Sequence, residues 1–272
     1  MPGASSRTVF VAAVLSLSGC GGRVAISLPD GPGVPLGDPA ERFAIATAGC
    51  ADVRSVVAEA RVSGSVGRTR VRATLLVGAD RDGNARIEAL AGPGGPVLVL
   101  TARAEAATLV LPREQQVLQD ASVEQVLEAL VGVPLRADDL AMTLTGCAGA
   151  GQAPAGGRSY RGGADAFDLA GGTTVWTRGS TGGSRAIAWR RGSLTVAYER
   201  NARARPSRVR LVVTDARQSG AEAADLTITL SRVDVNEPID PDAFVARVPR
   251  NAQPVTLDAL RRSGPLGGAA RP

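Results

Sequence analysis

Histidine and lysine are both missing from this chain of 272 residues, so all 31 of its basic side chains are arginine. Without histidine, an imidazole-based catalytic triad and an imidazole-ligated zinc site are excluded. Without lysine, Schiff-base catalysis is excluded as well. Acidic residues cluster at 137–139 and 233–242, but the first cluster suits a helix start and the second lacks the spacing of a calcium loop. We therefore expect no enzyme, no metal and no cofactor, with a carboxylate-dependent hydrolase as the remaining enzymatic alternative.

Aromatic side chains are scarce, at 3% of the chain against 44% for all hydrophobic residues. The core must therefore be built from Val, Leu, Ile and Ala. Nucleic-acid binding would need a recognition helix, or stacking aromatic residues beside a basic face, and neither is evident. The formal net charge of +5 comes from scattered arginines, which are densest at 200–210. We interpret that run as a solvated surface and expect no nucleic-acid partner.

Cysteine occurs three times, and the first cysteine follows a secretion signal. Residues 1–19 carry one charge, Arg7, then an apolar run that is too short to span a membrane. Residues 17–20, Leu-Ser-Gly-Cys, resemble the bacterial lipobox. This resemblance implies cleavage before Cys20, diacylglycerol on its thiol and an acyl chain such as palmitate on the new N-terminus. An ordinary secretion signal with an incidental cysteine is the alternative.

The residue after Cys20 bears on which membrane holds the anchor. In well-known diderm bacteria an Asp at this position retains a lipoprotein in the inner membrane, whereas this chain has Gly21. By resemblance to that rule, we expect an outer-membrane lipoprotein that faces the periplasm.

Two cysteines then remain, Cys50 and Cys147. In an oxidising compartment an even number of cysteines indicates a disulfide, and two free buried thiols are the alternative. The bridge would close a loop of about a hundred residues, a constraint worth up to about 4–5 kcal/mol in the chain-entropy model.

The chain after the signal divides into a tether, one domain and a tail. Residues 20–37 are rich in Gly and Pro and predict a flexible tether, 38–262 predict a folded domain, and 263–272 predict a disordered tail. Helical spacing predicts helices near 39–48, 122–132, 137–146 and 255–263. Period-two alternation and turn residues predict ten or eleven antiparallel strands. These are expected at 58–66, 71–77, 85–89, 97–100, 107–112, 158–170, 173–178, 184–190, 193–200, 207–214 and 224–232.

Two of these strands, 97–100 and 107–112, are apolar on both faces. Such strands are covered on both sides or line an apolar cavity. A sheet of so many strands must curl to bury one face. We therefore expect the helices at 122–146 to cover the open side of a curled sheet.

Two motifs in the middle of the chain carry a family resemblance. "GPGG" (92–95) lies between two strands, and a helical stretch at 122–147 follows. Their order, on a precursor with a lipobox, resembles the outer-membrane lipoprotein receptor LolB and its LolA-like relatives. The C-terminal stretch 244–260 also resembles the ends of that family. The landmarks within the helical stretch are Leu130, Gly132, Pro134, Leu135, Leu140, Leu144 and Gly146.

The resemblance implies a mainly β fold of the α+β type, an open, strongly curved antiparallel half-barrel with a helical lid. It implies an apolar cavity for the acyl chains of lipoproteins or lipids, a periplasmic LolA-like carrier as partner, and a role in lipoprotein localisation. Receptors of the family place an exposed Leu where this chain has Gly94, so we expect no side chain to insert into the membrane there. The expected cavity residues are Leu90, Leu98, Leu100, Leu109, Leu127, Leu130, Leu135, Leu140 and Leu144.

A second function remains open on the same evidence. A structural outer-membrane lipoprotein could use the same half-barrel to bind a protein partner in envelope assembly. An apolar cavity able to admit an acyl chain would favour lipid binding, and an interior filled by side chains would favour the structural role.

Overall fold

The computed structural model describes residues 25–90, 94–104, 106–180, 183–215 and 222–263. The predicted signal, the anchor residue Cys20, the first two residues of the "GPGG" motif and nearly all of the predicted tail lie outside these residues. Among the described residues, no helix is both long enough and apolar enough to cross a bilayer.

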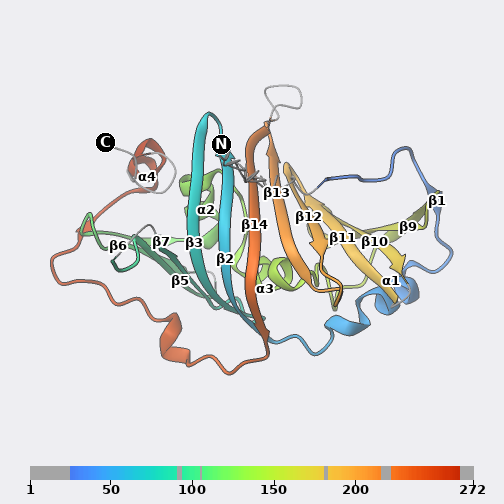
Figure 1. Ribbon diagram of the computed structural model, residues 1–272, viewed down its shortest axis with the longest axis horizontal. Helices are drawn as coiled ribbons and strands as arrows, with labels where there is room; N and C mark the ends of the chain where they lie inside the picture. Colours follow the sequence, from blue (N-terminus) through green and yellow to red (C-terminus); the bar gives the residue numbers. More distant parts are fainter. Residues whose placement is uncertain (1–24, 91–93, 105, 181–182, 216–221, 264–272) are drawn as a thin grey trace, which may run out of the picture.

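One large curved and unclosed sheet organises the described chain (Figure 1). Its fifteen strands follow the order β1-β8-β9-β10-β11-β12-β13-β14-β2-β3-β4-β5-β6-β7-β15. Every neighbouring pair is antiparallel except β15 and β7, which run parallel. The strands are β1 (Val34–Pro35), β2 (Ser55–Val66), β3 (Thr69–Asp80), β4 (Ala85–Leu90), β5 (Leu98–Arg103), β6 (Ala106–Leu111), β7 (Gln116–Ala121), β8 (Gly156–Tyr160), β9 (Ala164–Leu169), β10 (Thr173–Ser180), β11 (Gly183–Arg191), β12 (Leu194–Arg200), β13 (Pro206–Thr214), β14 (Glu222–Val235) and β15 (Gln253–Pro254).

The predicted fold class is confirmed, with more strands than the ten or eleven expected. Residues 158–170 form a hairpin rather than one strand, because Gly162 and Gly163 adopt positive φ in the turn between β8 and β9. Strand β7 was not predicted, since its polar residues give no clean alternation. The two-residue strands β1 and β15 are too short to leave a period-two pattern.

The described residues also form four α-helices: α1 (Pro39–Thr47), α2 (Val123–Val131), α3 (Ala137–Thr145) and α4 (Leu257–Ser263). Helix α2 begins with the predicted capping box, in which the Ser122 hydroxyl accepts from Gln125 N and the Gln125 side chain accepts from Ser122 N. It ends at Gly132, whose positive φ of 67° forms a left-handed cap. Helix α3 ends in the same way at Gly146.

The main core lies on the concave side of the sheet, under α2 and α3. On β2, alternate residues Val56, Ala58, Ala60 and Val62 are buried, and the residues between them face the convex side. These inward-facing rows join the apolar residues of α2 and α3 in one aliphatic cluster.

A smaller cluster lies on the convex side of the sheet. It contains Trp176 and three alanines of neighbouring strands, and the guanidinium of Arg190 lies 5.2 Å from the centroid of the Trp176 ring. Ile26 and Leu28 pack against this cluster. Part of the segment predicted as a free tether therefore lies along the sheet.

Both edges of the sheet are occupied by segments from near the ends of the described chain. At one edge, β1 pairs with β8, and Leu36 N donates to Gly157 O at 3.0 Å. At the other edge, β15 pairs with β7, and Val255 N donates to Val117 O at 2.8 Å.

Candidate functional site

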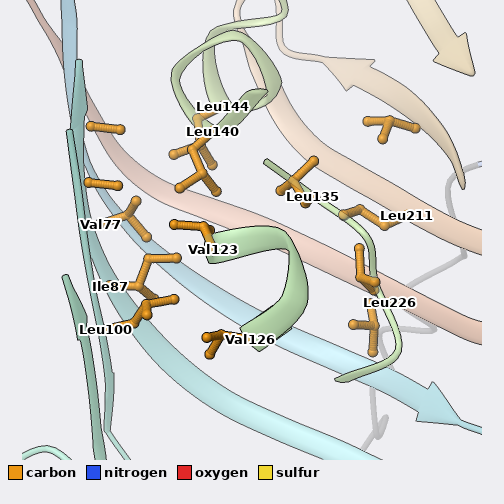
Figure 2. Packing of buried hydrophobic residues seen from close by; sticks show 14 of the residues in the cluster. Val77, Ile87, Leu100, Val123, Val126, Leu135, Leu140, Leu144, Leu211 and Leu226 are labelled. Carbon is orange, nitrogen blue, oxygen red and sulfur yellow. The ribbon is translucent and has the colours of Figure 1, made fainter. Parts of the chain in front are cut away.

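An apolar cavity of about 110 Å³ lies between the concave face of the sheet and the helices α2 and α3. Its walls come from β2, β3, β4, β5, β13 and β14, and its roof from α2, the 132–136 linker and α3. Figure 2 shows the buried side chains of sheet and roof pointing toward one another, with Val77 and Ile87 on the sheet and Leu140 and Leu144 on α3. Among the lining residues that the structure describes, Thr143 is the one with a polar side chain.

Six of the nine predicted cavity leucines line this space: Leu98, Leu127, Leu130, Leu135, Leu140 and Leu144. Leu98 belongs to β5, and the other five belong to the roof. The spacing that predicted a helical lid over the sheet therefore also located most of the roof residues.

The other three predicted leucines lie elsewhere. Leu100 and Leu109 pair across β5 and β6 and are fully buried in the core, where they do not line the cavity. Figure 2 shows Leu100 beside Ile87 and near Val126 of α2. Leu90 is the next residue after Ala89, which lines the cavity, so the pleat turns Leu90 to the convex face.

The aliphatic residues that line the sheet side of the cavity were not predicted from the sequence. Ala60 and Val62 on β2, and Leu226 and Ile228 on β14, line the cavity without having been predicted to do so. Their period-two alternation was the available signal: it identified an inward-facing row, but it could not distinguish packed positions from cavity positions.

Five lining residues are only partly buried: Ala73, Leu75, Leu127, Val131 and Ile228. They come from β3, α2 and β14, and the other lining residues are buried. The cavity therefore reaches solvent between α2 and the middle of the sheet.

Thr143 is 1% exposed, and its hydroxyl has no hydrogen-bond partner among the described residues. A buried hydroxyl without a partner costs about 1–3 kcal/mol. The neighbouring Thr145 hydroxyl, in contrast, donates to Ala141 O at 2.7 Å.

Helix α3 is attached to the sheet by a buried ion pair. Both terminal nitrogens of Arg191, on β11, donate to the carboxylate of Asp139, and this hydrogen bond raises the pKa of Arg191. The backbone N–H of Arg136 donates to the same carboxylate at 3.1 Å. The carboxylate therefore connects the start of α3 to the wall of the sheet.

Two further side chains hold the later turns of α3. The Tyr198 hydroxyl accepts from Trp189 Nε1 at 3.2 Å and lies 3.5 Å from Met142 O, and burial raises the pKa of Tyr198 far above its usual value. Arg200 donates to Gly146 O at 3.4 Å and to Ala186 O at 2.8 Å, and burial lowers its pKa. A guanidinium at a helix C-terminus also offsets the negative end of the helix dipole.

The chain that follows α3 is bonded covalently to the segment after α1. Cys50 and Cys147 are joined with an S–S distance of 2.06 Å across a sequence separation of 97 residues. Helix α2 has no such attachment to the sheet. It packs against α4, whose Leu260 is 1% exposed, and against β6 of the sheet.

The chemistry available at this site is that of an apolar ligand. The lining offers no ionised side chain, and no group of acidic or cysteine side chains among the described residues could hold a metal ion. Gly94, the predicted loop-tip position, lies between β4 and β5 with a positive φ of 116°.

No protein-family model and no curated protein matches this sequence. Solved structures do match its fold. A LolA superfamily protein from Nitrosomonas europaea aligns with a TM-score of 0.51 and 14% identity, covering 76% of this chain and 96% of that chain. The described chain has the LolA-like fold.

A second structure agrees with this assignment. A DUF1329 family protein from Desulfovibrio piger aligns with a TM-score of 0.51 and 12% identity, covering 76% of this chain and 98% of that chain. Identities this low establish a shared architecture only. The cavity in this LolA-like chain must be interpreted from its own residues.

Proposed function

We propose that this protein is a membrane-anchored periplasmic lipoprotein that binds the acyl chains of lipoproteins or lipids in the cavity under α2 and α3. The observation that carries the proposal is the lining, which is apolar at every position except Thr143. An apolar cavity stays dry, so an acyl chain can enter without displacing hydrogen-bonded water. Each methylene group transferred from water contributes about 0.8 kcal/mol to binding.

The size of the cavity implies that the roof moves on binding. About 110 Å³ accommodates part of an acyl chain, and the partly buried residues of α2 lie at the opening. Helix α3 is held by Asp139, Tyr198 and Arg200, whereas α2 ends at the left-handed Gly132. We infer that α2 swings away from the sheet about Gly132 while α3 stays in place.

The lipobox resemblance supports the anchoring role, and the family resemblance of the sequence supports the transport role. Acylation of Cys20 would hold the domain at the periplasmic face of the outer membrane, and a LolA-like carrier would supply the acylated client. The protein would act by binding rather than catalysis, since the residues that line the cavity include no ionised side chain. An open apolar cavity favours this role over a purely structural one.

Two neighbouring leucines on β3 allow a matched test. Leu75 lines the cavity, and Leu76 faces the convex side with 41% of its surface exposed. Leu75→Asp places a carboxylate at the opening, where burying it against an acyl chain is costly. Leu76→Asp introduces the same charge one residue along on the other face.

The experiment measures binding of a fluorescent acyl ester, and then of an acylated lipoprotein, to chains that also carry Cys20→Ser. We expect a one-to-one complex for the Cys20→Ser parent and for Leu76→Asp, and a loss of at least tenfold in affinity for Leu75→Asp. Circular dichroism melts establish that both variants are folded. Absence of any complex with the parent chain would refute the proposal, as would equal binding by the two variants.

A further inference from the structure

The convex face of the central strands carries three arginines without acidic partners, and a fourth lies in the turn beside them. Arg61 lies on β2, Arg70 and Arg72 lie on β3, and Arg68 lies in the turn between them. All four are exposed, and none forms an ion pair with any residue in the described parts of the chain. We call these four residues the arginine patch.

The register of the sheet keeps carboxylates away from most of this patch. Arg72 pairs with Ser63, Arg70 with Ser65, and Arg61 with Thr74 on one side and Thr229 on the other. The guanidinium groups are therefore interspersed with hydroxyl side chains.

Glu59 lies two residues before Arg61 on the same face of β2, and no ion pair joins the two side chains. The acid on β14 that pairs with this part of β2 is Asp225, opposite Ser65 in the register. Its carboxylate already accepts from Arg210 Nε at 2.8 Å, and Arg210 also binds Glu222. Asp225 therefore does not neutralise the arginine patch, which keeps its positive charge.

The arginine patch also lies where the curved sheet would first meet a flat surface. The patch residues on strands lie on β2 and β3, the ninth and tenth of the fifteen strands in sheet order. Figure 1 shows these strands at the middle of the curved sheet, with α2 and α3 behind them. A convex sheet touches a plane along its middle strands, so the patch would make the first contact.

We propose that the arginine patch docks on the anionic phosphate headgroups of a lipid bilayer. A guanidinium binds phosphate oxygens with two parallel hydrogen bonds, and several arginines on one exposed face match a surface of many phosphates. Exposed arginines that do not surround a groove are better suited to bind a planar surface of phosphates than to enclose a single soluble anion. Each arginine near an anionic membrane contributes roughly a fivefold increase in affinity.

The path of the chain near its described start agrees with this orientation. Ile26 and Leu28 pack on the convex side, beside Trp176. If Cys20 is acylated as proposed above, the lipid is attached six residues before Ile26, and the chain reaches the body of the domain on this face. The convex side would then face the membrane and the cavity would face away from it. The arginine patch itself is an independent observation, and its test does not require acylation.

The test is vesicle co-sedimentation of chains carrying Cys20→Ser, so that no acyl group contributes. The vesicles contain either phosphatidylcholine alone or phosphatidylcholine with about 30% phosphatidylglycerol. One variant replaces Arg61, Arg70 and Arg72 with Thr, a residue that suits strands. The matched control replaces three exposed arginines outside the patch with Thr: Arg54, Arg247 and Arg250.

We expect the parent and the control to bind the anionic vesicles similarly, and the patch variant to bind roughly 100-fold more weakly. Binding to phosphatidylcholine alone should be weak for all three chains, and about 0.5 M salt should remove the difference by screening. Equal binding by patch variant and control, or equal binding of the parent to both vesicle types, would overturn the proposal. The patch variant should still bind the fluorescent acyl ester, so failure at this surface is distinguishable from failure of the cavity proposal.

Discussion

Arg191, on strand β11, holds the carboxylate of Asp139, on helix α3, with both of its terminal nitrogens. Asp139 is 6% exposed and Arg191 is 16% exposed at their side chains, so water screens the pair only weakly. The pair fixes the first turn of the roof helix to the sheet. Because both charges are withdrawn from water, the result of removing one differs from that of removing both.

Asp139→Ala should destabilise the protein by about 3–5 kcal/mol, because it leaves the Arg191 cation buried without its partner. The double variant Asp139→Ala with Arg191→Met should recover part of that loss. Urea unfolding of the two single variants and the double variant gives the coupling energy. Strictly additive losses would contradict a buried, coupled pair.

Thr143→Val should stabilise the unliganded protein by about 1 kcal/mol, because it replaces an unpartnered buried hydroxyl with a methyl group of similar shape. Thr145→Val is the matched control on the same helix. It removes the hydrogen bond to Ala141 O and should not stabilise. The urea unfolding midpoints of the two variants test this prediction. Equal shifts for both variants would contradict the conclusion that the buried Thr143 hydroxyl has no hydrogen-bond partner.

Reduction of the bond between Cys50 and Cys147 should raise the intact mass by two hydrogen atoms. Replacing both cysteines with Ala should lower the free energy of unfolding by up to about 4–5 kcal/mol, because the bond closes a loop of nearly a hundred residues. Mass spectrometry and urea unfolding test the two statements. Two thiols that titrate without reductant would show that the bond is not formed.

Asp138→Asn should stabilise the protein near pH 7. Burial, followed by repulsion from Asp139, raises the pKa of Asp138 above the ordinary value of 3.8. Because the pKa is raised in the folded protein, folding favours the protonated acid. The stabilisation from this preference is fully present below about pH 3.8 and is lost as the pH rises through the raised pKa. The advantage of Asn should therefore vanish near pH 3. Melting temperatures of both proteins across this range test the sign, and a variant that is less stable near pH 7 would contradict it.

The sequence predicted the curved sheet and its helical cover because both depend on local patterns. Alternation along 58–66 and 71–77 identified which residues face inward, and Ser122 with Gln125 identified the start of α2. The edge strands β1 and β15 could not be predicted, because two residues carry no periodicity. Their pairing depends on where distant segments of the chain come to lie.

The cavity was predicted less completely than the fold. Leucines of the roof were found, since helical spacing separates inward from outward positions. Leu100 and Leu109 face the same side of the sheet as the cavity, but other side chains pack over them. Whether an inward-facing residue is packed or lines the cavity depends on the position of α2, and alternation along a strand does not indicate it. The pairing of Asp139 with Arg191 joins residues 52 positions apart, and no local pattern indicates such a contact.

The two short strands that pair with β8 and β7 have a consequence for aggregation. Each contains a proline, Pro35 in β1 and Pro254 in β15, and proline has no backbone N–H to offer to another strand. An open sheet would otherwise present two ladders of unsatisfied groups to its neighbours, the usual starting point for fibres. Because its own proline-containing segments cover both edges, the sheet can stay open without pairing edge to edge with other copies.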